Sequence, residues 1–315
     1  MNKIFINRIV VCVVLALVTA SCVFYFSPTL MGFLAIAITL GLRHGMDADH
    51  IVAIDNITRK LSQENKSSAT TGLYFAIGHS TIVFCLTLIV VLGINTSHTF
   101  YSTLSTMGDK FGGMISISFL LLTIIMNVIA FRNLDNLQNN EDNLYPGLIF
   151  TFANKYLFKA INRPEKMFIV GFFFGLGFDT ATEIALLSIA ATATIHGFNI
   201  IFILLLPILF ACGMCITDTI NSIFMSKIYH WVNHSKQKLY LYNYIILSFA
   251  TLATLIVAGI EIVNLTNKYK PLNNLLVALS ATLDNNSDLF GATIAGVFIV
   301  LGFGVYLKLL NNKQG

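Results

Sequence analysis

Long apolar runs are the feature that most constrains this chain. Eight stretches of about twenty mostly apolar residues follow one another, which is the length an α-helix needs to cross a bilayer. They cover residues 7–26, 30–52, 71–93, 111–131, 167–191, 199–225, 241–264 and 288–310. Only 11% of the residues are charged, against about 25% in soluble domains, so the composition excludes an ordinary globular enzyme. The sequence predicts an all-α integral membrane protein with eight transmembrane helices.

The connections between the predicted helices are short. Residues 132–166 are the longest connection, so residues 1–315 are expected to form a single transmembrane transporter domain. The net charge of +4, spread over short loops, suggests a lipid bilayer as the surroundings and no nucleic-acid partner. Five cysteines, an odd number, do not make a disulfide framework. The oligomeric state stays open.

The amino terminus resembles a secretory signal, with Lys3 and Arg8 ahead of an apolar run. That run continues through Val23–Phe26, past any small-residue cleavage site, and the chain re-enters the membrane at Leu30. A retained first helix is therefore favoured over a cleaved signal.

Basic residues are divided unequally between the two sides of this topology. With the amino terminus inside, fifteen lysines and arginines face inward and three face outward, namely Lys110, Lys268 and Lys270. An excess of basic residues marks cytoplasmic loops. The sequence predicts a multi-pass protein of the cell inner (cytoplasmic) membrane with both termini in the cytoplasm.

A weak internal repeat relates the second and third predicted helices to the fifth and sixth. GMDADHI (45–51) resembles GFDTATEI (177–184), and FAIGHS (75–80) resembles FACGMC (210–215). The second helix would run inward and the fifth outward, so the repeat of helices 2–4 and 5–7 would be inverted. Inverted repeats with interrupted, polar helices are typical of secondary transporters.

Ionisable side chains concentrate at the end of the second apolar run, where residues 42–51 read LRHGMDADHI. Such groups are costly in a membrane unless they are paired or line a watery cavity, so the cluster indicates a functional site. Imidazole and carboxylate together suit Ni, Co, Zn or Cu. A solvated helix end is the alternative, but residues 51–54 are apolar again.

Helical periodicity decides which of these groups can act together. Asp47 and His50 share a face, His44 lies beside them, and Asp49 falls on the opposite side. If Asp49 also serves the site, the helix must bend or unwind, which Gly45 makes easier.

Three other predicted helices carry candidate ligands. His79 in the third is either a ligand or an interhelical hydrogen-bonding group. Asp179 and Glu183 in the fifth share a face, and two acids close together in a dry site favour a bound cation or proton. Asp218 in the sixth aligns with Met214 and Asn221. The metal site is thus expected to comprise His44, Asp47, Asp49, His50, His79, Asp179, Glu183 and Asp218.

The combined motifs resemble those of the nickel/cobalt transporter family of bacterial and fungal membrane permeases. Four signatures match, RHGMDADHI (43–51), FAIGHSTIV (75–83), LGFDTATE (176–183) and GMCITDTIN (213–221). Asn221 departs from the pattern, since the family commonly has Asp there, and this removes one charge from the sixth helix.

The resemblance implies high-affinity import of Ni²⁺, with Co²⁺ as a second substrate, and no cofactor. It also places His44, Asp49 and His50 first among the functional residues. Two alternatives remain. An efflux permease is disfavoured because the connection 132–166 holds no histidine to collect metal. An intramembrane metallohydrolase is disfavoured because the chain lacks HExxH, so we expect a transporter and not an enzyme.

Overall fold

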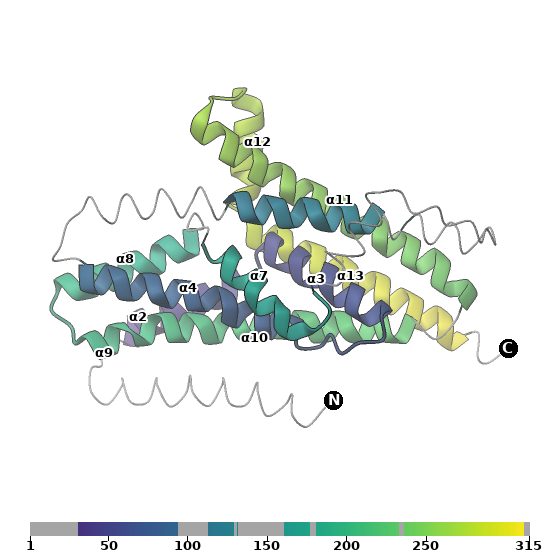
Figure 1. Cartoon of the computed structure of the whole chain (residues 1–315), viewed down its shortest axis with the longest axis horizontal. Helices are drawn as coiled ribbons and strands as arrows, with labels where there is room; N and C mark the ends of the chain where they lie inside the picture. The colour runs from purple at the N-terminus through teal and green to yellow at the C-terminus, as the bar shows by residue number, and fades with distance from the viewer. Residues whose placement is uncertain are drawn as a thin grey trace. The chain divides into compact units, whose positions relative to one another are not determined.

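The computed structural model describes residues 31–93, 113–128, 131, 161–176, 181–232 and 236–311. Its regular elements in these ranges are all helices, which confirms the all-α fold class. They are α2 (Met31–His44), α3 (Ala48–Gln63), α4 (Thr71–Gly93), a helix at Gly113–Val128, η3 (Pro164–Lys166), α7 (Met167–Phe174), α8 (Ala181–Ile195), α9 (Ile200–Ile203), α10 (Leu205–Val232), α11 (Lys236–Tyr269), α12 (Asn274–Asp284) and α13 (Ser287–Asn311). Figure 1 shows their order along the chain.

Three helices in the described ranges are long and apolar enough to cross a membrane, at Thr71–Leu92, Ile200–Tyr229 and Leu247–Asn267. Five shorter apolar helices accompany them. These features fit a multi-pass membrane protein. The predicted first helix, 7–26, and most of the connection 132–166 lie outside the described residues, so the number of eight stays a prediction.

The predicted helix 30–52 is two helices. α2 ends at His44, residues 45–47 form a turn, and α3 begins at Ala48. α3 also continues to Gln63, well past the predicted end at residue 52. Ile54, Ile57 and Leu61 are fully buried at helical spacing, so an amphipathic face packed on the protein, not a membrane, explains the extension.

The predicted helix 199–225 is also divided, into α9 and α10, with Leu204 between them. Pro207 lies in the first turn of α10 and has no N–H to donate to the carbonyl of Ile203, so the helix cannot pass through unbroken. α12 was not predicted, because its eleven residues are too few to register as a span. Its first turn is capped by Asn273, whose side chain accepts a hydrogen bond from the Leu275 N–H at 3.1 Å.

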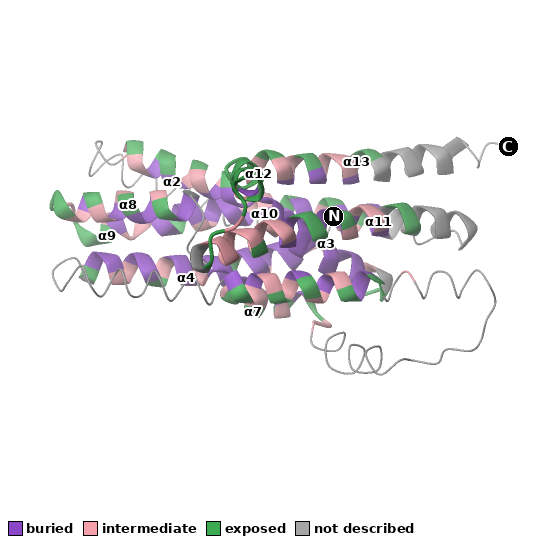
Figure 2. Ribbon diagram, turned by 90° about the horizontal axis from the view of Figure 1, so that it is seen from above, coloured by how far each residue is buried: buried purple, intermediate pink, exposed green. Residues whose placement is uncertain are grey.

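The chain separates into two compact units. The first comprises Met1–Asp47, Gly72–Ser116 and Phe168–Ile220, and the second comprises Ala48–Thr71, Ile117–Met167 and Asn221–Gly315. The core of the first is formed by apolar side chains of α2, α4, α8 and α10. The core of the second joins α3 to α11, α13 and the end of α10. Figure 2 shows α3 largely buried and α12 largely exposed.

Glycines bring two pairs of helices of the first unit into close contact. A Cβ on Gly41 of α2 would lie 2.0 Å from the carbonyl oxygen of Phe210 in α10. A Cβ on Gly171 of α7 would lie 2.0 Å from the carbonyl oxygen of Phe75 in α4. Only glycine permits backbones this close.

The two contacts repeat in register along both pairs. Gly213 of α10 faces the carbonyl of Ile38, and Gly78 of α4 faces the carbonyl of Phe168. Ile38 and Phe168 each precede the glycine of their own helix by three residues, and Gly213 and Gly78 each follow the contacting phenylalanine by three. The helix pairs α2–α10 and α7–α4 are therefore packed in the same way.

Helix directions in the first unit follow from the contacts along each pair. α2 and α8 run antiparallel, because His44 meets Thr182 at one end and Phe33 meets Phe198 at the other. α4 and α8 pack side by side through Ile82, Leu86 and Val90 against Leu187. Figures 1 and 2 both show α2, α4 and α8 side by side.

Candidate metal site

The candidate ligands are placed by helix ends. His44 is the last residue of α2, Asp47 lies in the turn that follows, and His50 is the third residue of α3. Glu183 lies in the first turn of α8. His79 is the exception, since it sits within α4. All five are buried, with at most 5% of each residue exposed.

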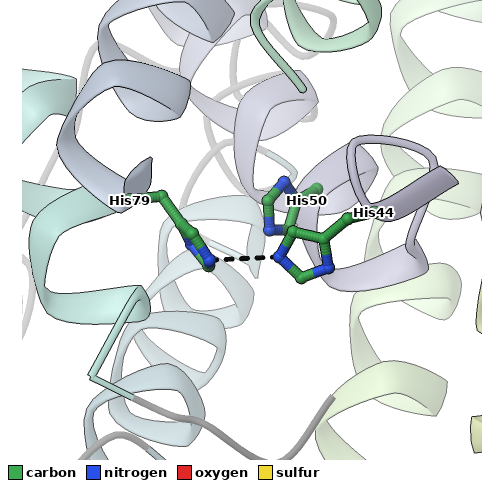
Figure 3. Close-up of side chains that lie close together, drawn as sticks. All are labelled: His44, His50 and His79. Atoms are coloured by element: carbon green, nitrogen blue, oxygen red, sulfur yellow. Dashed lines mark hydrogen bonds between the residues drawn. The ribbon is translucent and has the colours of Figure 1, made fainter. Parts of the chain in front are cut away.

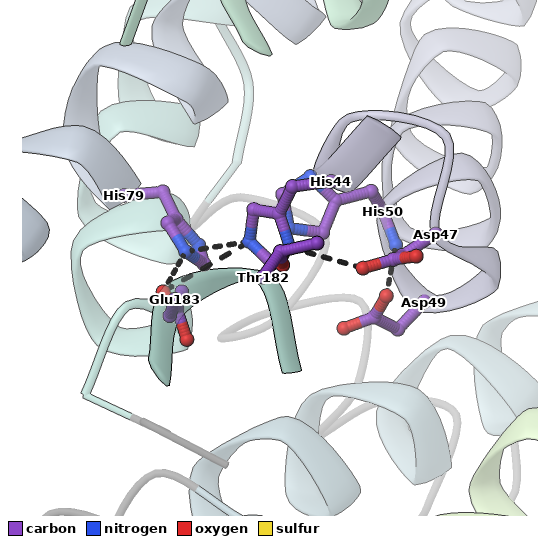
Figure 4. Close-up of polar contacts among 7 residues, drawn as sticks. All are labelled: His44, Asp47, Asp49, His50, His79, Thr182 and Glu183. Atoms are coloured by element: carbon purple, nitrogen blue, oxygen red, sulfur yellow. Dashed lines mark hydrogen bonds and ion pairs between the residues drawn. The ribbon is translucent and has the colours of Figure 1, made fainter. Parts of the chain in front are cut away.

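His44 is held from two sides. Its Nδ1 lies 2.9 Å from Oδ2 of Asp47 and 3.0 Å from the hydroxyl of Thr182. Its Nε2 lies 3.0 Å from Nε2 of His79 (Figure 4). A carboxylate on one ring nitrogen fixes the ring's orientation and makes the other nitrogen a better metal ligand. Asp47 therefore orients His44.

The Nε2 atoms of His44 and His79 converge with Oε1 of Glu183. The two nitrogens are 3.0 Å apart, His79 is 2.8 Å from Glu183, and His44 is 3.9 Å from Glu183. A point equidistant from these three atoms lies about 2.0 Å from each, which is the usual bond length from a transition metal to imidazole nitrogen or carboxylate oxygen. The three atoms can hold one ion without rearrangement.

His50 completes a histidine cluster. One ring nitrogen from each of His44, His50 and His79 lies within 4.8 Å of the others (Figure 3). Three imidazoles and a carboxylate favour Ni, Co, Zn or Cu over Mg or Ca. The spacing of the predicted ligands in sequence thus leads to a compact set of borderline nitrogen donors with one carboxylate oxygen.

The helix termini add a field suited to this set. The carboxyl end of α2, at His44, carries the partial negative charge that favours a cation. The amino end of α8 carries the partial positive charge that favours the carboxylate of Glu183. Interrupted helices whose ends meet at a polar site are the arrangement found at ion sites of secondary transporters.

Asp218 of α10 is fully buried beside the turn that joins α2 to α3. A Cβ on Gly45 would lie 3.2 Å from its Oδ1 and 2.0 Å from the hydroxyl of Thr217, so glycine is needed for α10 to reach the turn. Asn221, one helical turn further on, is buried as well.

Asp49 and Asp179 are the last two predicted ligands. Asp49 is half-buried, and its Oδ1 accepts a hydrogen bond from the backbone N–H of His50 at 2.9 Å. Asp179 lies outside the described residues. Arg43, in the last turn of α2, is exposed.

Three sulfur-containing side chains of α10 belong to the packing. Met214, Cys212 and Cys215 are buried in the apolar core of the first unit, and both cysteines are free thiols. His196 is exposed. One group of buried ionisable residues was missed altogether, Asp55 and Arg59 of α3. Their spacing of four residues, which places an acid and a base on one helix face, was the available signal.

Comparison with known proteins agrees with this geometry. A sequence model of the NicO family, described as high-affinity nickel-transport protein, matches residues 30–308. The chain belongs to this family. The match spans both units, and it confirms that the protein is a nickel/cobalt-type transport protein and not an enzyme.

Several relatives are similar over most of their length. The nickel transporter NixA of Staphylococcus aureus is 34% identical over 283 residues, which is 86% of this chain and 83% of the relative. The high-affinity nickel transport protein of Cupriavidus necator is 33% identical over 87% of this chain and 81% of its own. The cobalt transport protein NhlF of Rhodococcus rhodochrous is 32% identical over 89% and 84%. No solved structure matches the chain.

The family membership also indicates whether the metal is a substrate or a cofactor. Nickel and cobalt are the transported substrates in this family, and no cofactor is implied. The metal is therefore treated as a transported substrate and not as a resident cofactor.

Proposed function

We propose that this member of the NicO family imports Ni²⁺, with Co²⁺ as a second substrate, across the cytoplasmic membrane. The observation that carries the proposal is the convergence of His44, His79 and Glu183 on one point about 2.0 Å from each donor atom. These side chains, with His50, form the binding site that the ion occupies during transport.

The other predicted ligands have supporting roles in this proposal. Asp47 orients His44 through the 2.9 Å contact with its Nδ1. Asp218 supplies negative charge near the turn of residues 45–47, and Asp179, two residues before α8 in the sequence, supplies a further carboxylate. Asp49 accepts a hydrogen bond from the N–H of His50 in the first turn of α3. Their carboxylates stabilise a divalent cation in a dry site, where an unpaired charge would be costly.

Import is proposed from the energetics of the membrane. A potential that is negative inside favours inward movement of a divalent cation by about 4.6 kcal/mol per 100 mV. Relatives named as nickel transporters and one named as a cobalt transporter support the choice of substrates.

We further propose that residues 1–315 form a single eight-helix transport domain with an inverted repeat and both termini in the cytoplasm. The matched glycine contacts of α2–α10 and α7–α4 support the repeat. The antiparallel course of α2 and α8 supports its inverted direction. If Gly41 and Gly171 are equivalent positions, as their contacts indicate, then Gly45 is equivalent to Gly175. The sequence motifs instead align Gly45 with Gly177, two residues further on.

Radioactive ⁶³Ni²⁺ uptake tests the function. Cells that express the chain should accumulate ⁶³Ni²⁺ from nanomolar to micromolar solutions, and an excess of Co²⁺ should compete more strongly than Mn²⁺, which is the weakest binder in the Irving–Williams order. Inside-out vesicles supply the test of direction. Uptake into such vesicles driven by an energised membrane, with none into whole cells, would refute import and establish efflux.

A further inference from the structure

A second buried polar cluster lies in the second unit. It joins α3 to three other helices through side chains that are at most 5% exposed. Its members are Asp55, Asn56 and Arg59 of α3, Asn127 of the helix Gly113–Val128, Tyr229 of α10 and Thr254 of α11. Nothing in the proposed binding of nickel uses these residues.

Arg59 is held by neutral groups. One terminal nitrogen of its guanidinium donates to the side-chain oxygens of Asn56, at 2.9 Å, and of Asn127. Asn127 also donates to the Asn56 oxygen at 3.0 Å, and Asn56 donates to the hydroxyl of Thr254 at 3.1 Å. The Nε of Arg59 has no hydrogen-bond partner among the described residues. The guanidinium is therefore fixed in place by amides and not by an acid.

Asp55 has only half of the hydrogen bonding that a carboxylate requires. Its Oδ1 accepts a hydrogen bond from the hydroxyl of Tyr229 at 2.6 Å. Its Oδ2 has no partner within the described part of the chain. An ionised carboxylate buried in this way is costly, and such a group commonly takes up a proton.

The surroundings bring the titration of Asp55 close to physiological pH. Burial raises the pKa of Asp55 from 3.8 to about 6, while Arg59 and the hydrogen bond from Tyr229 act in the opposite direction. α3 is not one of the apolar helices that could span a membrane. A carboxyl of this kind is mostly ionised at pH 7 and mostly protonated at pH 5.

Among the described residues, no charge other than that of Arg59 acts on this carboxyl. α11 and α13 face α3 with apolar side chains such as Ala250, Ala253 and Phe298. The acids that the structure describes on these two helices, Glu261 and Asp288, are not among the groups that act on Asp55. Its charge state depends on Arg59 and on the contact with Tyr229.

We propose that Asp55 is a proton-binding residue, distinct from the metal cluster, whose proton exchange is coupled to the passage of the metal ion. The ligand is a proton that moves between bulk water and Oδ2 of Asp55. The coupling half of this inference rests on the proposed import of nickel, whereas the proton site itself does not.

The coupling has a mechanical basis in two continuous helices. α3 carries both His50 and, five residues later, Asp55. α10 carries both Asp218 and, eleven residues later, Tyr229. A shift of α3 against α10 when the ion enters or leaves breaks or makes the bond between Tyr229 and Asp55. Loss of that bond removes a donor that favours the ionised form, so Asp55 gains a proton.

Infrared difference spectroscopy of the purified, metal-free protein tests the proton site. A carboxylic acid band should appear as the pH falls through about 6, and Asp55→Asn should remove it. Tyr229→Phe should move the midpoint upward by about half to one pH unit, because a single hydrogen bond to the charged form is lost. Glu64→Gln, at an exposed acid just beyond α3, should leave the band unchanged. A band that persists in Asp55→Asn overturns the proposal.

Net ⁶³Ni²⁺ uptake into proteoliposomes tests the coupling. Asp55→Asn should lose net uptake at every pH between 5 and 8, while the nickel affinity of the purified variant stays that of the wild type. Tyr229→Phe should retain uptake with its pH profile shifted upward. Normal net uptake by Asp55→Asn overturns the coupling. If the wild-type protein moves no nickel but the infrared band titrates as stated, the proposed function fails and the proton site stands.

Discussion

His44 connects α2 to both α4 and α8 through its two ring nitrogens. One nitrogen faces Asp47 and Thr182, and the other faces His79. At the residue scale, therefore, the proposed site gives His44 and Asp47 different roles, the first as a ligand and the second as the group that orients it. Substitutions at the two positions should differ in size of effect.

His44→Ala should abolish nickel uptake, because it removes a donor from the three-atom centre. Asp47→Asn should weaken nickel binding by about 10–100-fold, the usual effect of removing a group that orients a ligand. Cellular uptake of ⁶³Ni²⁺ measures the first effect, and calorimetric titration of the purified variants with Ni²⁺ compares their binding. Glu165→Gln, at an exposed acid, is the control. Equal and complete loss in both variants would show that Asp47 is itself a ligand.

Asp49→Asn and His50→Ala are also expected to abolish uptake while the protein remains in the membrane. For His50 the reason is its place in the histidine cluster. For Asp49 the reason is the family resemblance, since the structure shows only its bond to the neighbouring N–H. Normal uptake by the His50 variant would show that the metal binds at another site. Normal uptake by the Asp49 variant would leave that residue only its hydrogen bond with the N–H of His50.

Metal binding should release protons. Nε2 of His79 lies 3.0 Å from Nε2 of His44 and 2.8 Å from Oε1 of Glu183, so at least one hydrogen occupies these contacts, and a bound cation would displace it. The apparent affinity for Ni²⁺ should therefore fall as the pH drops from about 7 to about 5, a range that includes the pKa of free imidazole. Calorimetry in buffers of different ionisation enthalpy counts the protons, and Glu183→Gln should release fewer. Affinity that stays constant over this range would exclude proton displacement.

At the scale of elements, the site depends on helices that stop. α2 ends at His44 and α8 begins just before Glu183, so helix termini, and not helix faces, present these two side chains. Close glycine contacts hold the interrupted helices against their unbroken neighbours, α10 and α4. The same pattern of glycine contacts occurs twice, between α2 and α10 and between α7 and α4, and each time it joins a helix of one half of the proposed repeat to a helix of the other.

Gly41→Ala and Gly171→Ala should therefore destabilise the protein to a similar degree. Each added methyl group would lie 2.0 Å from a backbone carbonyl oxygen, and overpacking of this kind costs about 1–3 kcal/mol. Thermal unfolding in detergent should show a lower Tm for both variants. Gly32→Ala, where a Cβ meets nothing within 4 Å, should leave the Tm unchanged. A loss of stability in one variant only would argue that the α2–α10 and α7–α4 contacts are not equivalent.

At the scale of the whole molecule, the proposed topology makes the two faces of the membrane distinguishable. Membrane-impermeant thiol reagents should not reach a single cysteine placed at Asn65 or Asn139 in intact cells, because these positions belong to the basic, cytoplasmic side. A cysteine at Ser97 or Asn273 should be labelled. The labelling is read on a variant whose five native cysteines are replaced. External labelling at Asn139 would refute the orientation and the inverted repeat together.

The sequence was sufficient for the class of protein and for most of the candidate site. Apolar runs of membrane length form helices, because each backbone N–H and C=O group in the bilayer must find its hydrogen-bond partner within its own segment. The position of α4 was predicted to the residue for the same reason. Buried His, Asp and Glu in such runs are too costly to be incidental, so His44, His50, His79 and Glu183 could be selected without coordinates.

Only the tertiary structure decided where helices break and which polar groups meet. A sequence window shows how apolar a segment is, but the turn after His44 depends on α10 approaching Gly45, a contact between residues far apart in the chain. For the same reason, the structure sets Asp49 apart from the three-atom centre and makes Thr182 a partner of His44. Asp55 was missed because it lies beyond residue 52, where the second predicted helix was expected to end. Its burial comes from Tyr229 and the helices around α3, which only folding brings together.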